Sequence, residues 1–297
     1  MEDYVEYLDF SSVHLGAIAE EMGDYNSAYR FYSKALGRLM HYQGDSMTAI
    51  MYAQELRGKL SRTSGSGFNM PLLNFEKWLL TKSSYVKGNQ CIKYLYLDQY
   101  NKKDRTPPNE ARKALFNLGH DFEDRFRAEK FPGGINVKEK VRSFNYFNSY
   151  TKYLLKRSGP ALLYEATILE EDVLIMVDVL VKNDNDTFDF YEVKANTNLN
   201  VAIKNDVALQ YYICKKRFGE KIKSFNIVLR GNSDSGNYKI MDVTSEMESK
   251  INEVRQKILS FKNVLRSTMP TLSIGEHCNS PYDCDFKEFC SRQKDYS

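Results

Sequence analysis

The chain has 297 residues, a mass of 34.5 kDa and a formal net charge of +3. Hydrophobic residues make up 42% and charged residues 27%, which excludes a disordered chain, and 16 glycines with 7 prolines exclude a collagen-like one. The length predicts about two domains. The near-neutral charge neither indicates nor excludes nucleic-acid binding, because a basic surface can be balanced by acidic residues elsewhere.

The first residues of the chain and its apolar stretches bear on the cellular compartment of the protein. The first residues, MEDYVEYLDF, contain neither the basic region nor the apolar region of a secretory signal. The longest apolar stretch, residues 173–181, is interrupted by Asp178 and is too short to cross a bilayer. We therefore expect a cytoplasmic protein with no membrane interaction, in which clustered cysteines bind metal more often than they form disulfides.

Residues 1–62 form the first predicted domain, a small all-α helical segment. In LGAIAEEMGDYNSAYRFYSKAL the small residues Gly16 and Ala28 and the large residues Tyr32 and Leu36 are spaced as in a tetratricopeptide repeat, with Gly23-Asp24 as the turn. A third helix is predicted over residues 46–60. About three repeats are needed to bury a solenoid core, so we expect this segment to pack on the rest of the chain, a second copy or a protein partner. A plain helical hairpin is the alternative.

A polar stretch at residues 61–67, rich in Gly and Ser, predicts a linker, which we assign to residues 63–79. Residues 80–297 are predicted as one α/β domain. Its helices are predicted over residues 108–130, 142–157, 200–218 and 245–265. Its strands are predicted over residues 162–169, 173–181, 188–193, 224–230 and 238–243. The first three strands are joined by short polar turns, which predicts an antiparallel meander, and strands enclosed by helices predict a sandwich.

Two of these strands carry a group of charged residues. Asp178 lies in an otherwise apolar strand, where a buried carboxylate is costly unless it is paired or binds a cation. Glu192 and Lys194 occupy alternate positions of the next strand and therefore share one face. If the strands are neighbours, two carboxylates and the Val193 carbonyl offer the oxygen ligands that Mg²⁺ or Mn²⁺ prefers. Lys194 would orient or activate a water at such a site.

This Asp…Glu-x-Lys pattern resembles that of the PD-(D/E)XK nuclease superfamily. The following helix carries Gln210 in DVALQYYICKK, similar to a glutamine of the RecB-like branch that helps to place the substrate backbone and the catalytic lysine. Here Tyr211 and Tyr212 follow the glutamine, which departs from the commonest form of that motif. The resemblance implies a restriction-endonuclease-like mixed sheet flanked by helices, with Asp178, Glu192, Lys194 and Gln210 as catalytic residues.

Two further residues are candidates for this site. His120, in LGHDFE, resembles the helical Gly/His element of RecB-like nucleases that have an additional histidine metal ligand. The resemblance implies a ligand set of His120, Asp178 and Glu192, which favours Mn²⁺ over Mg²⁺. The alternative is a histidine on the helix face, paired with Glu123 or Asp124. Glu165 is a candidate for a further acid, although pairing with a lysine or arginine explains it equally well.

Five cysteines divide into four and one. The spacing C-x₅-C-x₅-C of Cys278, Cys284 and Cys290, together with Cys91 upstream, makes a four-ligand set for zinc or an iron–sulfur cluster. This arrangement resembles the AddB-type and CRISPR-associated RecB-like exonucleases. It implies a [4Fe–4S] cluster that ties the first helix of the nuclease domain to the C-terminal tail, although Ile92 stands where relatives often have proline. Zn²⁺ in the same ligands and scattered structural cysteines are alternatives; Cys214 is expected to be a core thiol.

The resemblance covers residues 80–294 and implies a metal-dependent deoxyribonuclease, acting as an exonuclease on single-stranded DNA or on free ends. Candidate phosphate contacts are the basic clusters at residues 138–142 and 215–217 and Lys204, and some of the 21 tyrosines are candidates for base stacking. One alternative is a non-catalytic nuclease-fold module that binds protein or nucleic acid, with residues 1–62 as its docking surface. Another is a zinc-stabilised nucleic-acid-binding protein without hydrolysis.

Overall fold

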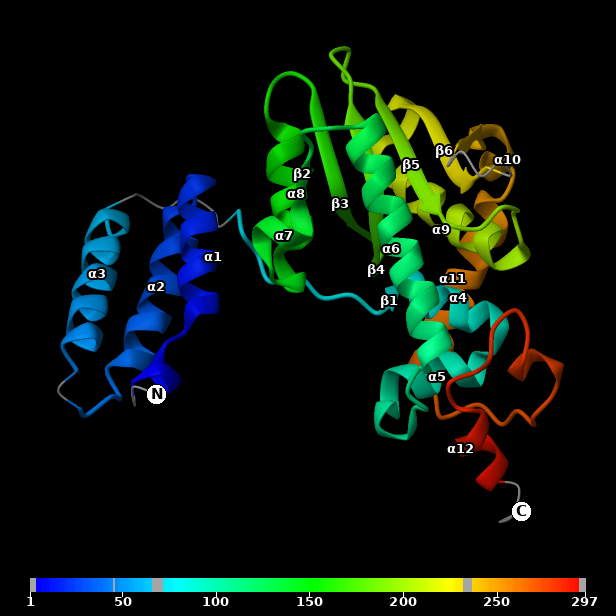
Figure 1. Cartoon of the computed structure of the whole chain (residues 1–297), viewed down its shortest axis with the longest axis horizontal. Helices are drawn as coiled ribbons and strands as arrows, with labels where there is room; N and C mark the ends of the chain where they lie inside the picture. The colour runs from blue at the N-terminus through cyan, green and yellow to red at the C-terminus, as the bar shows by residue number, and fades with distance from the viewer. Residues whose placement is uncertain (1–3, 45, 66–71, 232–236, 294–297) are drawn as a thin grey trace. The chain divides into compact units, whose positions relative to one another are not determined.

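The structure is a computed structural model that describes residues 4–44, 46–65, 72–231 and 237–293. It divides into two compact units, whose helices and strands are labelled in Figure 1. The helical unit comprises Met1–Glu76 and Asn136–Ser158, and the larger unit comprises Lys77–Ile135 and Gly159–Ser297. This division differs from the predicted one, because the helical unit includes a second segment that the sequence analysis assigned to the α/β domain.

The first three helices of the helical unit are those predicted: α1 (Phe10–Glu21), α2 (Tyr25–Leu39) and α3 (Met47–Thr63), preceded by a 3₁₀ turn, η1 (Val5–Tyr7). Gly16 of α1 lies against Tyr32 of α2, so closely that a Cβ at Gly16 would be 2.4 Å from the tyrosine ring. Gly23 has a left-handed φ of 72°, and the Asp24 side chain caps α2 by accepting the backbone N–H of Ser27 at 3.0 Å. The predicted turn is therefore confirmed.

The predicted linker over residues 63–79 is wrong in part. Thr63 is a buried residue at the end of α3. The backbone N–H groups of Leu72 and Leu73 donate to Asp24 Oδ2 at 2.7 and 2.9 Å, and Leu73 is fully buried. A buried carboxylate needs hydrogen-bond donors, so Asp24 holds residues 72–73 in the helical unit. Residues 66–71 of the predicted linker lie outside the described residues.

The second segment of the helical unit contains α7 (Val137–Val141), η3 (Phe144–Tyr146) and α8 (Phe147–Lys156). The helix predicted over residues 142–157 therefore begins later, because Arg142 adopts a left-handed φ of 58°. The segment packs on α1, where Tyr150 donates to Glu21 Oε1 at 2.8 Å and His14 Nε2 donates to the Lys140 carbonyl at 2.8 Å. These contacts join residues more than a hundred positions apart, so no local pattern predicts them.

The larger unit contains a mixed open sheet. Its strands are β1 (Leu80–Thr81), β2 (Ile135–Asn136), β3 (Ala161–Glu170), β4 (Val173–Lys182), β5 (Phe188–Lys194), β6 (Ile222–Arg230) and β7 (Tyr238–Asp242). They are ordered β2-β3-β4-β5-β6-β7, and β1 pairs in parallel with β4. β3, β4 and β5 form the predicted antiparallel meander, β6 pairs in parallel with β5, and β7 is antiparallel to β6. The predicted α/β class is therefore confirmed.

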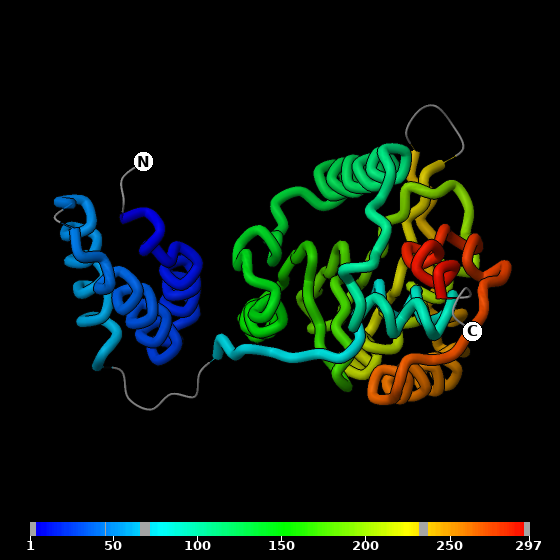
Figure 2. The backbone as a smooth tube through the Cα atoms, turned by 90° about the horizontal axis from the view of Figure 1, so that it is seen from below, coloured from blue at the N-terminus to red at the C-terminus, as the bar shows by residue number. Residues whose placement is uncertain are grey.

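Helices flank this sheet on both faces (Figure 2), with α6 (Glu110–Lys130) packed on β5 and α9 (Val201–Phe218) on β3, β4 and β6. The other helices of the unit are α4 (Lys82–Gln90), α5 (Ile92–Tyr100), α10 (Thr244–Glu248), α11 (Ile251–Arg266) and α12 (Lys287–Arg292), with 3₁₀ turns η2 (Lys102–Asp104), η4 (Gly219–Lys221) and η5 (Glu276–Cys278). The helix predicted over residues 245–265 is interrupted, because the Ser249 hydroxyl donates to the Glu246 carbonyl at 2.7 Å and competes with the helical backbone bonds.

The core positions the charged residues on β5. Phe122 and Phe126 of α6 pack against Val179, Val193 and Val228 on one face of the sheet. Because side chains alternate along a strand, the neighbours of Val193, which are Glu192 and Lys194, point to the opposite face. No helix within the described ranges is both long and apolar enough to span a bilayer.

Candidate active site

A fork in the sheet creates the site. β4 and β5 pair as far as Val179 and Tyr191, and beyond that point the Asp178 side chain accepts the Val193 N–H at Oδ2, at 2.6 Å. A carboxylate thus takes the place of a backbone carbonyl, and the two strands separate. β3 occupies the other edge of β4 along its length, so β1 pairs with β4 on the edge that β5 leaves. Helix α4 begins directly after β1, at the opening of the fork.

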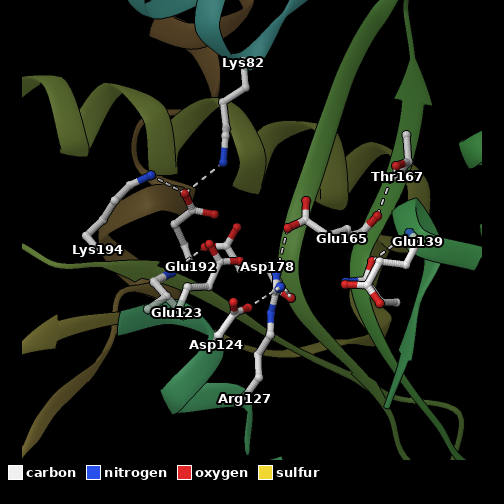
Figure 3. A network of polar contacts seen from close by, with 12 residues as sticks. Lys82, Glu123, Asp124, Arg127, Glu139, Glu165, Thr167, Asp178, Glu192 and Lys194 are labelled. Atoms are coloured by element: carbon white, nitrogen blue, oxygen red, sulfur yellow. Dashed lines mark hydrogen bonds and ion pairs between the residues drawn. The ribbon is translucent and has the colours of Figure 1, made fainter. Parts of the chain in front are cut away.

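Four acidic side chains from four elements meet at this fork (Figure 3). Asp178 of β4 is 7% exposed and Glu192 of β5 is fully buried. Glu165 of β3 lies between Tyr164 and Ala166, which pair with the two neighbours of Asp178, and has a left-handed φ of 52°. Glu123 of α6 faces the same group. The predicted convergence of Asp178 and Glu192 is therefore present, with two further acids beside them.

Three cations, Arg127, Lys194 and Lys82, compensate part of this negative charge. Arg127 of α6 pairs with Glu123 and, at 2.9 Å, with Glu165, and it donates to the Asp178 carbonyl at 3.1 Å. Pairing of Glu165 with an arginine was one of the two interpretations of this residue.

Two lysines meet on the other side of the acidic group. Lys194 pairs with Glu192 and, at 2.8 Å, with Asp206 of α9. Lys82, the first residue of α4, pairs with Glu192 at 2.9 Å. Glu192 is thus held between two ammonium groups.

The carboxyl groups differ in their proton affinity. Burial, followed by the charges of Glu192 and Glu123, raises the pKa of Asp178 well above its ordinary value. Burial also raises the pKa of Glu123 to about 7, against the opposing effect of Arg127. Burial would raise the pKa of Glu192 as well, but Lys194 and Lys82 outweigh it and lower that pKa to about 2. Glu192 is therefore ionised, whereas Asp178 and Glu123 hold a proton more readily than ordinary carboxyl groups, because their charges would be buried and close together.

The chemistry of the site suits a hard divalent cation. Leaving out the exposed Asp124, five carboxylates against three cations give a formal charge of −2; the acids are Glu123, Glu165, Asp178, Glu192 and Asp206, and the cations are Lys82, Arg127 and Lys194. Glu192 Oε2 is buried and has no hydrogen-bond partner among the described residues. Oxygen ligands with surplus negative charge are those that Mg²⁺ and Mn²⁺ prefer. The described part of the chain nevertheless has no group of three or more His, Cys, Asp or Glu side chains arranged to hold a metal ion.

His120 and Gln210 are less directly connected to this group. His120 is exposed on α6, one turn before Glu123, and both Glu123 and Asp124 pair with Arg127, which leaves the alternative of a His120 ion pair unsupported. Gln210 is fully buried on α9, one turn after Asp206, and neither polar atom of its side chain has a partner in the described ranges.

Sequence reasoning missed four residues of the site: Lys82, Glu123, Arg127 and Asp206. For three of them a helical signal exists. Glu123 and Arg127 are four residues apart on the helix that carries His120, and Asp206 precedes Gln210 by four residues. Lys82 has no such signal, because it is brought to the site by the pairing of β1 with β4.

The four predicted cluster cysteines come together at a second place. Cys91, Cys278, Cys284 and Cys290 line one small pocket with residues of α5 and the C-terminal tail, so they are not scattered. Cys91 ends α4 and caps α5, and its Sγ accepts the Tyr94 N–H at 3.4 Å. Burial, with added effects of the neighbouring thiols, raises the pKa of Cys284 to about 11. Cys214 is fully buried on α9, as expected of a core thiol.

Hydrogen bonds hold the cysteine-bearing tail against the helices. Asp285, next to Cys284, accepts from the Tyr94 hydroxyl at 2.8 Å and from Arg105 Nε at 2.7 Å, and it also pairs with Arg112. The Gln90 side chain donates to the carbonyls of His277 and Tyr282 at 2.7 and 2.6 Å. The tail is thereby fixed on α4, α5 and α6.

Comparisons with known proteins add little to this geometry. No family model matches the chain, and no curated protein matches it. Among solved structures, one titled "Crystal structure of SSO0001" is similar with a TM-score of 0.35 and 11% identity, over 84% of this chain and 98% of the other. At this TM-score the similarity supports no conclusion about fold or function.

Proposed function

We propose that the protein is a metal-dependent deoxyribonuclease with the restriction-endonuclease-like fold of the PD-(D/E)XK superfamily, in its RecB-like iron–sulfur branch. The observation that carries this proposal is the convergence of Asp178, Glu192 and Lys194 at the fork between β4 and β5, in a group with surplus negative charge. Single-stranded DNA or free DNA ends are the proposed substrates.

In this proposal Asp178 and Glu192 hold Mn²⁺ or Mg²⁺, with the Val193 carbonyl and Glu123 beside them and His120 as an additional ligand from α6. A bound divalent cation supplies positive charge for the phosphate and lowers the pKa of a bound water. Lys194 orients the attacking water, and Asp206 holds the lysine in place at 2.8 Å. The buried amide of Gln210 is available to a substrate or water at the inner end of the site.

The four cysteines are proposed to hold a [4Fe–4S] cluster, and Zn²⁺ is the alternative occupant. Four cysteine side chains around one pocket are ligands that suit either group, which binds them as thiolates. The role of this group is structural in the proposal: it fastens the tail to Cys91, at the junction of α4 and α5.

A non-catalytic binding module is the second candidate function. The observation that favours it is an exposed apolar face on α3 of the helical unit, where Met47, Ile50 and Met51 are 69%, 46% and 64% exposed. A face of this kind, at helical spacing, suits a protein partner.

One assay separates the two functions. End-labelled linear and circular single-stranded DNA are incubated with the full chain and Mn²⁺, and with a Lys194→Ala variant. We expect degradation of the linear substrate by the wild type and none by the variant. Equal survival of DNA with both proteins, once the cysteine site is confirmed to be loaded, would overturn the nuclease proposal.

A further inference from the structure

Glu192 holds two lysines on the same oxygen. Lys82 Nζ lies 2.9 Å from Glu192 Oε1, and Lys194 Nζ contacts that same atom. The other oxygen, Oε2, is buried and unpartnered within the described chain. Figure 3 shows the Glu192 carboxylate between the two lysines and the acids Glu123 and Asp178. Two ammonium groups on one oxygen fix the rotation of the carboxylate and leave the second oxygen available.

The position of Lys82 is set by rigid elements. β1 pairs with β4 at Leu80 and Thr81, and α4 begins at the next residue. Thr81 and Ser84 form a reciprocal capping box, in which the Thr81 N–H donates to Ser84 Oγ at 2.7 Å and the Ser84 N–H donates to Thr81 Oγ1 at 3.2 Å. The start of the helix, and with it Lys82, therefore has one defined orientation.

The far end of α4 is held as firmly. Gly88 lies against Phe261 of α11, where a Cβ would be 2.9 Å from the ring, and Tyr85 packs edge-on against the same ring at 5.4 Å. Because both ends of α4 are held, Lys82 is directed at Glu192 by the fold rather than by the flexibility of its own side chain. Its side chain is 26% exposed, so it lies at the solvent side of the buried carboxylate.

We propose that Lys82 is a positioning residue of the nuclease site: with Lys194, it holds Glu192 so that Oε2 is directed toward the divalent cation. This inference rests on the proposed function. Lys194 is shared between two carboxylates, Glu192 and Asp206, so by itself it does not fix Glu192. Lys82 supplies a second contact to Glu192 from a different element, the start of α4. The two lysines thus act as a clamp from two sides of the fork.

The clamp makes opposite predictions for metal binding and for catalysis. Lys82 is a positive charge beside a proposed metal ligand. Its removal should therefore strengthen the binding of a cation and lower the Kd for Mn²⁺ by at least about threefold. Loss of the second restraint on Glu192 misplaces Oε2, and a small misplacement in an active site lowers kcat by about 10–100-fold. A residue that merely stabilised the fold would lower metal affinity and kcat together.

The test measures Mn²⁺ binding by electron paramagnetic resonance of free Mn²⁺, separately from the kinetics of DNA hydrolysis, in Lys82→Met, Lys82→Arg and wild type. We expect Lys82→Met to bind Mn²⁺ more tightly and to lose kcat at little-changed KM, with partial recovery of kcat in Lys82→Arg. Lys257→Met is the matched control, since it removes one lysine from an exposed helical ion pair on α11.

Weaker Mn²⁺ binding together with a lower kcat in Lys82→Met, or wild-type values for both, overturns the inference. Thermal unfolding of each variant identifies a folding defect, and the Arg variant supplies the measurement if Lys82→Met does not fold. If the wild type hydrolyses DNA and Lys82→Met has the same kcat and Mn²⁺ affinity, the role of Lys82 is refuted but the proposed function stands. A wild type that neither binds Mn²⁺ nor cleaves DNA refutes the proposed function, and the inference falls with it.

Discussion

Lys82 and Glu192 are 110 positions apart in the chain, yet their side chains meet at 2.9 Å. The contact exists because β5 leaves β4 at Asp178 and β1 takes its place, which brings the start of α4 to the buried end of β5. The carboxylate that a bound cation would use is thus held by a residue from a different part of the fold.

Asp178→Asn tests the carboxylate at the branch point of the fork. Asparagine keeps an oxygen that accepts the Val193 N–H but removes the charge. We expect Mn²⁺-dependent hydrolysis to fall by at least about 100-fold, because the site loses a proposed metal ligand. The thermal midpoint should stay equal or rise, because a neutral amide is less costly to bury than a carboxylate. Activity within a factor of two of wild type would refute the role of Asp178.

Asp206→Asn tests how Lys194 is held. Lys194 would keep its pair with Glu192 but lose the 2.8 Å contact with Asp206. We expect kcat to fall by about tenfold, because the lysine proposed to orient the attacking water is no longer fixed. Asp186→Asn, in an exposed turn where the residue pairs with Lys182 and Lys221, is the control and should leave kcat unchanged. Equal kcat values for the two variants would contradict this role of Asp206.

Loss of a cysteine tests the second site. Cys284→Ser should remove the visible absorption of an iron–sulfur cluster from anaerobically purified protein, and it should lower the thermal midpoint because the tail loses a tie to α4 and α5. Cys214→Ala, which changes a buried thiol on α9 remote from that pocket's lining, should keep the absorption. A colourless wild type with stoichiometric zinc by elemental analysis would show that Zn²⁺ is the occupant.

Gly16→Ala tests the approach of α1 and α2. The added Cβ would meet the Tyr32 ring at 2.4 Å, so we expect a loss of about 1–3 kcal/mol in the free energy of unfolding. Gly37→Ala is the control, because a Cβ at that exposed position of α2 has no atom within 4 Å. It should raise the free energy of unfolding by about 0.5–1 kcal/mol, since alanine favours the helix. Chemical denaturation measures the free energy of unfolding of both variants. Equal changes in Gly16→Ala and Gly37→Ala would show that the close packing of Gly16 on Tyr32 does not affect stability.

Asp9→Asn tests a pH-dependent helix cap. Asp9 accepts the Ser12 N–H at 2.9 Å and the Ser12 hydroxyl at 2.8 Å. Burial acts to raise the pKa of Asp9, but these two bonds and the charges of Lys34 and Arg38 lower it below the ordinary value of 3.8. Because the pKa of the folded state is the lower one, the carboxylate stabilises the fold above pH 3.8, and this contribution disappears as the pH falls through the folded pKa.

Asparagine can still cap the helix but loses the negative charge at its N-terminus, so at neutral pH we expect Asp9→Asn to lose about 0.3–1 kcal/mol of unfolding free energy, and the difference from wild type to shrink in acid. Denaturation curves of the two proteins at several pH values measure it. A difference that stays constant down to acid pH would mean that the charge of Asp9 contributes nothing to the cap.

Local patterns in the sequence determined much of the fold. The antiparallel order of β3, β4 and β5 follows from the short turns between them, and the alternation of Glu192, Val193 and Lys194 follows from the pleat of a strand. The helices α6 and α9 were predicted nearly to the residue, and the small and large residues predicted to pair α1 with α2 include Gly16 and Tyr32, which lie in close contact. In each case the information lies within one element or two neighbouring ones, where backbone geometry alone relates the residues.

Only the tertiary structure decided which distant side chains complete the site. Asp206 replaces Gln210 as the partner of Lys194, and Arg127 joins the acids of α6 and β3. The fork that admits Lys82 depends on β1 pairing with β4, and a two-residue strand leaves no periodic signal. The segment 136–158 joins the helical unit for the same kind of reason. The spacing of residues along the sequence determines which face of its own helix or strand a side chain occupies. Whether side chains from distant elements meet depends on which elements pack together, and the spacing carries no information about that.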